Sequence, residues 1–216
     1  MLAHFVAPTP ARLGFIVPYS PLLLLVLEPA TILPGVLIMT SGNLSEEPIA
    51  YENAEARERL ESLADGFLMH DRPIYMRIDD SVVTMLREKP YIVRRARGFA
   101  PQQLRLPWDA VPLLATGTEL KNTFCLTRER YAFVSHYIGD LENQETLSSF
   151  EQAIRHYERV FRIQPEALAC DLHPDYLATH YAQARSRAES LPLVAVQHHH
   201  AHIASCLAEN GWASPE

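Results

Sequence analysis

The second half of the sequence alternates between stretches with helical periodicity and short apolar runs. Of all the features of the sequence, this alternation most strongly limits the folds that the chain can adopt. Such a pattern predicts helices that cover a sheet of short strands. Strand-like runs joined by tight turns precede it and suggest an antiparallel meander. In chain order the expected elements are strands 113–115, 123–127 and 131–135, helix 145–161, strand 167–170, helix 174–188, strand 193–196 and a helix from about His199. The meander and the alternation together predict an α/β fold.

The first half also contains helix start signals and apolar runs. Ser20 and Pro21 match the N-cap and first position of a helix, and the run Leu22–Leu27 is apolar on all sides, which predicts a buried helix. Further patterns indicate a buried strand at 35–40, a charged helix at 53–64, and strands at 66–69, 81–86 and 91–94.

The segment Ala100–Pro112 contains three prolines and little periodicity. We therefore predict a domain boundary there, with one domain over residues 1–107 and a second over residues 108–216. Residues 1–12 show neither a strand pattern nor a helix cap, and the sequence stops shortly after a histidine cluster. From these two ends we expect a fragment of a longer chain.

Composition excludes several classes of protein. With 216 residues, 48% hydrophobic and 21% charged, the chain has enough apolar surface for a core and is not a disordered protein. A net charge of −7 argues against a protein whose overall positive charge binds nucleic acid. A local basic patch is still possible. The three cysteines form no C-x-x-C pair, and no secretory signal or bilayer-length apolar run is seen, so a cytoplasmic location without membrane contact is expected.

Four of the ten histidines fall within five residues, in the segment Gln197–His202. His198 and His202 are four positions apart, so on a helix both face the same side and could share one metal ion. The alternative is that these are solvated or capping histidines. A further ligand, such as a carboxylate, would have to come from elsewhere. The segment Asp171–Pro174 could cap the next helix or could face the histidine helix.

Two further segments could bind anions. Thr40, Ser41, Gly42 and Asn43 follow an apolar run and could hydrogen-bond a phosphate or carboxylate, although spacing alone favours an ordinary polar turn. Downstream, the basic residues Arg94, Arg95 and Arg97 would suit a triphosphate or RNA, and the acids Asp79 and Asp80 next to Ser81 could hold Mg²⁺. A charged edge strand with salt bridges explains the same residues about as well.

Seven motifs occur in an order that resembles a known family. They are TSGNLSEEPIA, RIDDSVV, RRARGFAP, GTELKNTF, IGDLEN, CDLHPDY and VQHHHAH. Together they resemble the HypF family of hydrogenase maturation carbamoyltransferases from about Leu13 to Gly211. Residues up to about Pro107 resemble the C-terminal part of a YrdC-like domain, a twisted mixed sheet with helices. The rest resembles the start of an ASKHA-type, ribonuclease H-like α/β domain.

The resemblance implies an activity and a set of site residues. The family forms carbamoyl adenylate from carbamoyl phosphate and ATP, releases pyrophosphate, and passes the carbamoyl group to the C-terminal cysteine of the partner HypE. ATP with Mg²⁺ and a divalent metal, zinc or iron, are the implied cofactors. By correspondence, Thr40, Ser41 and Asn43 fall on the nucleotide and carbamate loop. Ser81 and Arg94, with the neighbouring Arg95 and Arg97, fall on the adenylate site, and His198 and His202 fall on the metal pair.

The sequence departs from the family pattern at one place and leaves alternatives open. At residues 135–139 the family usually reads Ser-Gln-His-Ile-Gly, whereas His136 and Tyr137 stand here in place of Gln and His. Because family chains are much longer, the fragment alone is expected to be inactive. A YrdC-type RNA-binding module and an inactive remnant are the competing interpretations.

Overall fold

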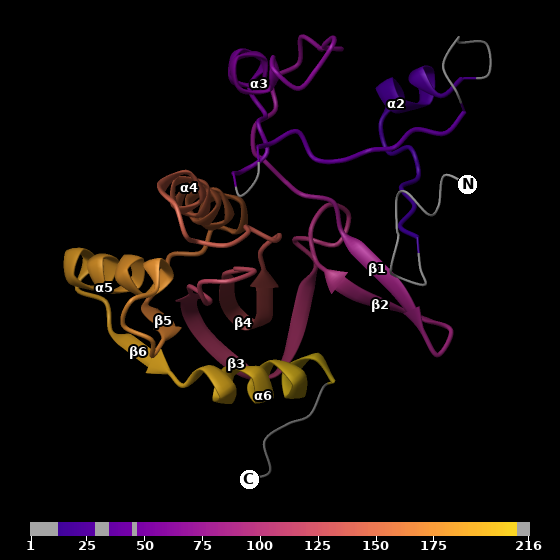
Figure 1. Ribbon diagram of the computed structural model, residues 1–216. Helices are drawn as coiled ribbons and strands as arrows, with labels where there is room; N and C mark the ends of the chain where they lie inside the picture. The colour runs from indigo at the N-terminus through magenta and orange to yellow at the C-terminus, as the bar shows by residue number, and fades with distance from the viewer. Residues whose placement is uncertain (1–12, 29–34, 45–46, 211–216) are drawn as a thin grey trace. The chain divides into compact units, whose positions relative to one another are not determined.

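Figure 1 shows a computed structural model of the chain, which describes residues 13–28, 35–44 and 47–210. The expectations drawn from residues 1–12 and 211–216 lie outside the described residues. The chain forms two compact units that divide between Ser41 and Gly42, and each is considered by itself. No helix among the described residues has the length and apolar character needed to cross a membrane.

The first unit contains the helix α2 (Pro21–Val26). Its predicted start is confirmed, because the Ser20 side chain accepts a hydrogen bond from the Leu23 N–H and proline occupies the first turn. The expectation of burial is wrong, since Leu24 and Leu25 are 59% and 62% exposed. The strand expected at 35–40 is also wrong: these residues form no strand. An apolar run becomes a strand only where a neighbouring chain segment accepts and donates backbone hydrogen bonds.

The second unit begins with α3 (Asn53–Leu60) and a β-hairpin. The helix matches the expected charged helix, although it ends before Ala64, and the strand expected at 66–69 is wrong because those residues are not in a strand. β1 (Val82–Leu86) and β2 (Lys89–Arg94) pair antiparallel, close to the predicted bounds. Arg87 and Glu88 join them with positive φ angles of 49° and 63°. A two-residue hairpin turn that matches the twist of its strands requires such angles.

The four-stranded sheet of this unit has the order β4-β3-β5-β6. Its strands are β3 (Gln103–Ala115), β4 (Cys125–Val134), β5 (Ala167–Asp171) and β6 (Leu193–Val196). β3 is antiparallel to β4 and parallel to β5, and β5 is parallel to β6. The expected α/β fold class is confirmed.

Two strands are longer than the sequence predicts. β4 is one strand where two were expected, and β3 begins inside the segment Ala100–Pro112, where we predicted a domain boundary. Two of the three prolines of that segment, Pro107 and Pro112, lie where the register between β3 and β4 shifts, between Arg105 and Ala110 and between Ala110 and Leu113. A residue without an N–H is tolerated at such irregularities. Position 107 therefore lies within a strand, and the division into two domains there stays a prediction.

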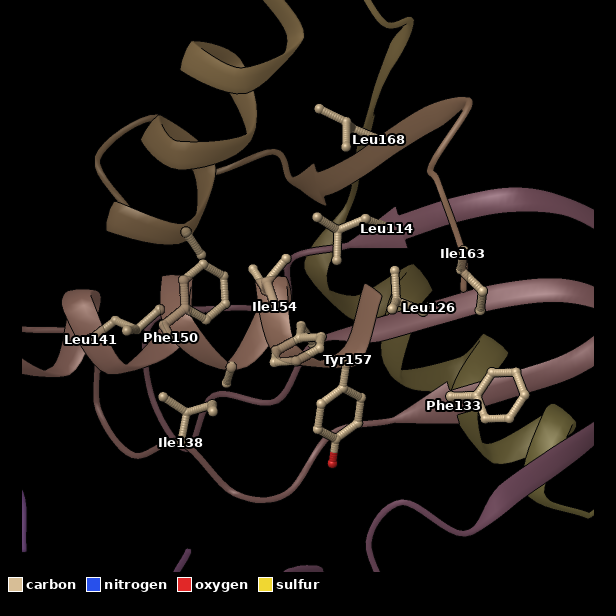
Figure 2. Packing of buried hydrophobic residues seen from close by; sticks show 13 residues of the cluster. Leu114, Leu126, Phe133, Ile138, Leu141, Phe150, Ile154, Tyr157, Ile163 and Leu168 are labelled. Carbon is tan, nitrogen blue, oxygen red and sulfur yellow. The ribbon is translucent and has the colours of Figure 1, made fainter. Parts of the chain in front are cut away.

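Three helices complete the unit: α4 (Gln144–Phe161), α5 (Leu177–Glu189) and α6 (His198–Glu209). In Figure 1, α4 and α5 lie on one side of the four-stranded sheet and α6 on the other. Figure 2 shows Phe150, Ile154 and Tyr157 of α4 among strand residues of the core. With Ala153, these positions repeat at helical spacing, so one face of α4 is buried against the sheet.

Candidate functional site

The histidine pair lies in the first turns of α6, which begins directly after β6. The Nε2 atoms of His198 and His202 are 3.1 Å apart, and their ring planes are inclined by 80°. Two histidines that share a tetrahedral ion at roughly 2.0–2.1 Å would hold these atoms about 3.3 Å apart. Without an ion this contact is a hydrogen bond in which one Nε2 donates to the other. The predicted helical spacing therefore brings both nitrogens to hydrogen-bond distance, a separation that also suits two ligands of one ion.

Asp171 joins this pair from a different strand. It ends β5 opposite Val196 of β6, so the carboxyl ends of two neighbouring parallel strands carry Asp171 and His198 to the same edge of the sheet. The Asp171 Oδ2 atom lies 2.8 Å from Nδ1 of His198. Asp171 therefore faces the histidine helix, while the N-cap position of α5 is occupied by Tyr176.

The donor set at this edge is incomplete. No cluster of three or more His, Cys, Asp or Glu side chains that could hold a metal ion occurs within residues 13–28, 35–44 and 47–210. Asp171 approaches the Nδ1 side of His198, away from the two Nε2 atoms, so it is not placed as a third ligand. The neighbouring His199 and His200 are exposed. The chemistry of the two imidazoles fits a divalent ion of the zinc or iron type, with other ligands supplied from outside this pair.

The three arginines of the basic segment point to different surroundings. The Arg94 guanidinium lies 4.7 Å from the centre of the Tyr137 ring, and Arg97 forms an ion pair of 3.5 Å with Asp80. The Nη1 atom of Arg95 is buried and has no hydrogen-bond partner among the described residues. β2 ends at Arg94, and Arg95 and Arg97 follow it outside the strand. The alternative of a basic surface for RNA therefore gains no support from this segment.

The hydroxyl of Ser81 is used within the fold. It accepts a hydrogen bond from the Ala96 N–H at 2.8 Å and donates one to the Arg97 carbonyl at 2.9 Å. This pairing holds the arginine segment beside the start of β1. Burial raises the pKa of the nearby Asp79, and the charge of Arg94 opposes that rise.

The remaining residues of the expected nucleotide loop belong to both units. Thr40 and Ser41 are exposed and lie in the first unit, whereas Asn43 lies in the second. Asn43 donates its side-chain N–H to the Leu44 carbonyl at 2.8 Å, and the Ala50 N–H donates to the Gly42 carbonyl at 2.9 Å. These local bonds have the character of a polar turn, which was the alternative interpretation.

Sequence reasoning noted Arg77 upstream of the arginine segment but assigned no role to Arg77 or to His136. Arg77 donates to the Ile138 carbonyl at 3.1 Å, and its Nη1 is buried without a partner among the described residues. His136 is 3% exposed, and burial, with the charge of Arg77 second, lowers the pKa of its imidazole to about 4. Tyr137 supplies the ring under Arg94. Both residues that depart from the family pattern are therefore built into the fold around the arginine segment.

Comparison with known proteins identifies the family. Residues 109–209 match the family described as the HypF Kae1-like domain, and residues 1–96 match the Sua5, YciO and YrdC family, described as telomere recombination. The carbamoyltransferase HypF of Rhodobacter capsulatus is 45% identical over 214 residues, which is 98% of this chain. The chain belongs to the HypF family. The HypF of Synechocystis sp. is 42% identical over 98% of the chain.

Solved HypF structures share the fold. The crystal structure of full-length HypF in a phosphate- and nucleotide-bound form superposes with a TM-score of 0.75 at 48% identity, over 81% of this chain and 27% of that one. The structure of T. kodakarensis HypF gives a TM-score of 0.76 at 37% identity, over 81% of this chain and 23% of that one. The chain spans 28% and 27% of the length of the two curated HypF relatives. The family and the fold that the motifs imply are thus confirmed.

Proposed function

We propose that this chain forms part of a HypF-type carbamoyltransferase. Such an enzyme makes carbamoyl adenylate from carbamoyl phosphate and ATP and passes the carbamoyl group to the C-terminal cysteine of a HypE-type protein. The observation that carries the proposal is the identity of 45% to a carbamoyltransferase HypF over 98% of the chain. The phosphate- and nucleotide-bound state named for a structural relative supports a nucleotide substrate.

The arginine segment and the polar loop are proposed to hold the nucleotide and the carbamoyl-bearing substrate. Carbamoyl phosphate first loses its phosphate to water as inorganic phosphate, which leaves carbamate. A carbamate oxygen then bonds to the α-phosphorus of ATP, and the bond to pyrophosphate breaks. Arginine guanidiniums stabilise the charge that develops on the leaving phosphates, and Mg²⁺ accompanies ATP. The residues assigned to this role are Thr40, Ser41, Asn43, Ser81, Arg94, Arg95 and Arg97.

The pair His198 and His202 is proposed to hold a zinc or iron ion of the transfer site. The support is the 3.1 Å separation of their Nε2 atoms on one helix face. When bound, such an ion polarises a carbonyl or phosphate oxygen. The protein's own contribution is to hold both imidazoles at the carboxyl edge of the sheet, next to the end of β5.

A chimera tests this function. In the Rhodobacter capsulatus relative, the matching 214-residue segment is replaced by this chain, and transfer of labelled carbamoyl groups to the HypE-type partner is measured. We expect ATP-dependent labelling of the partner's C-terminal cysteine. The double variant H198A/H202A is expected to lose transfer, whereas H199A/H200A, which removes two exposed histidines, keeps it. A soluble chimera that melts cooperatively and labels nothing would overturn the proposal.

A further inference from the structure

We propose that Asp171 is a positioning residue that fixes the tautomer and ring orientation of His198. In this arrangement Asp171 accepts the N–H of Nδ1, which leaves the lone pair of Nε2 free for a metal ion beside His202. This inference rests on the metal pair of the proposed function and adds a residue that does not itself bind the metal.

The Asp171 carboxylate is held from several directions. Its side chain is 4% exposed. One oxygen, Oδ1, accepts the backbone N–H of His173 at 2.9 Å, while the other, Oδ2, lies 2.8 Å from Nδ1 of His198. The Asp171 carbonyl also accepts the Thr179 hydroxyl at 3.1 Å, and its backbone pairs with Val196 in the sheet. The carboxylate therefore presents one oxygen to His198 from a fixed position.

The chemistry of imidazole makes this contact selective. A neutral histidine carries its proton on one ring nitrogen and offers a lone pair on the other, and a carboxylate only accepts hydrogen bonds. With Oδ2 at 2.8 Å, Nδ1 carries the proton, so Nε2 is the nitrogen with the lone pair. That atom is the one 3.1 Å from Nε2 of His202. A carboxylate behind a metal-binding histidine also raises the basicity of the ligand.

The alternative role is a structural bond that merely ties α6 to β5. The variant D171N separates the two roles because Asn is the same size and keeps an oxygen that can accept the His173 N–H. An amide can also donate to Nδ1, and replacing a carboxylate by an amide at such a position keeps the geometry but selects the wrong tautomer. The matched control is D175N, which removes the same charge at an exposed position nearby.

The experiment measures the purified full chain in two ways at one fixed pH. First, ¹⁵N NMR of histidine-labelled protein without metal identifies the tautomer of His198, with its signals assigned through an H198Q variant. We expect a proton on Nδ1 in the wild type and in D175N, and on Nε2 in D171N. Second, zinc affinity is measured by chelator competition. D171N is expected to bind zinc about 10- to 100-fold more weakly, the usual cost of removing a partner behind a ligand.

The outcomes separate this inference from the metal proposal. A zinc-binding wild type whose D171N variant keeps the same tautomer and affinity overturns the role of Asp171 alone. A wild-type His198 with its proton on Nε2 does the same. A wild type that binds no zinc overturns the metal pair and, with it, this assignment. Thermal melting of each variant shows whether a loss of affinity reflects unfolding instead.

Discussion

The residues around the histidine pair differ in how far sequence could predict them. His198 and His202 are four positions apart, and helix geometry makes residues at this spacing neighbours on one face. This short segment of sequence was therefore enough to predict that the two rings lie together. Asp171 lies 27 positions before His198 and reaches it because β5 and β6 are neighbours in the sheet. Sequence offered this contact only as one of two alternatives, since strand order is not a local property.

His136 couples the stability of the fold to pH. Burial lowers the pKa of its imidazole in the folded state to about 4, from an ordinary value of 6.5. Between these two pH values the unfolded chain takes up a proton that the folded chain does not. The contribution to stability is therefore present above pH 6.5 and is lost as pH falls toward 4. A shift of this size corresponds to about 3 kcal/mol.

The variant H136Q removes this titration and introduces the amide that the family usually has at this position. We expect urea unfolding between pH 7 and pH 4 to show a shallower loss of stability in H136Q than in the wild type, because one buried imidazole no longer resists protonation. The control H200A changes an exposed histidine and should keep the wild-type slope. An unchanged slope in H136Q would show that other groups govern the acid transition.

At the scale of elements, local patterns predicted helices better than strands. α4 was predicted to within one residue at its start and ends at the predicted residue. Its cap is local, because the Asn143 side chain accepts the N–H of Thr146 at 2.8 Å. No strand was predicted in the segment Ala100–Pro112 because prolines favour loops on average. Here Pro107 and Pro112 lie at register shifts of β3, and whether a proline is tolerated there depends on the partner strand. The runs at 35–40 and 66–69 form no strand for the same reason, since pairing requires a partner.

The buried face of α4 makes a quantitative prediction. Phe150 is fully buried and packs edge-to-face on Phe124 and Tyr181, with ring centres 6.0 Å and 5.3 Å away. We expect F150A to lower the free energy of unfolding by about 3–5 kcal/mol, because the change removes apolar contacts and leaves a cavity. Q152A, at an exposed position of the same helix, should change it by less than about 0.5 kcal/mol. Denaturant unfolding measures both values, and equal effects would contradict the assigned face.

At the scale of the whole molecule, the fold class could be predicted and the surroundings of the charged residues could not. Alternating helices and strands allow few architectures, so the α/β class followed from pattern alone. The arginine segment looked continuous in the sequence, yet Arg94 stacks on Tyr137, Arg97 pairs with Asp80, and the Nη1 atom of Arg95 is buried. Those partners come from other parts of the chain. A basic run therefore predicts charge but not whether the charges share one surface.

The proposed metal pair also predicts a response of the whole second unit. An ion that binds the folded chain and not the unfolded one stabilises it by mass action, by about 2.7 kcal/mol at a free concentration one hundred times its dissociation constant. Both proposed ligands lie on α6, and the bond from His198 to Asp171 ties that helix to β5. Zinc bound there should therefore raise the melting temperature of the sheet and not only of the helix.

We expect zinc to raise the melting temperature of the wild type and EDTA to reverse the rise, as followed by circular dichroism and by differential scanning calorimetry. H198A/H202A should lose the rise because both nitrogens of the pair are gone. H199A/H200A should keep it, since these exposed neighbours take no part in the pair. An equal rise in H198A/H202A would place the zinc elsewhere, for example at the exposed Cys206, and would separate the metal from the histidine pair. Because the two variants remove the same number of imidazoles, the comparison isolates position on the helix from histidine content.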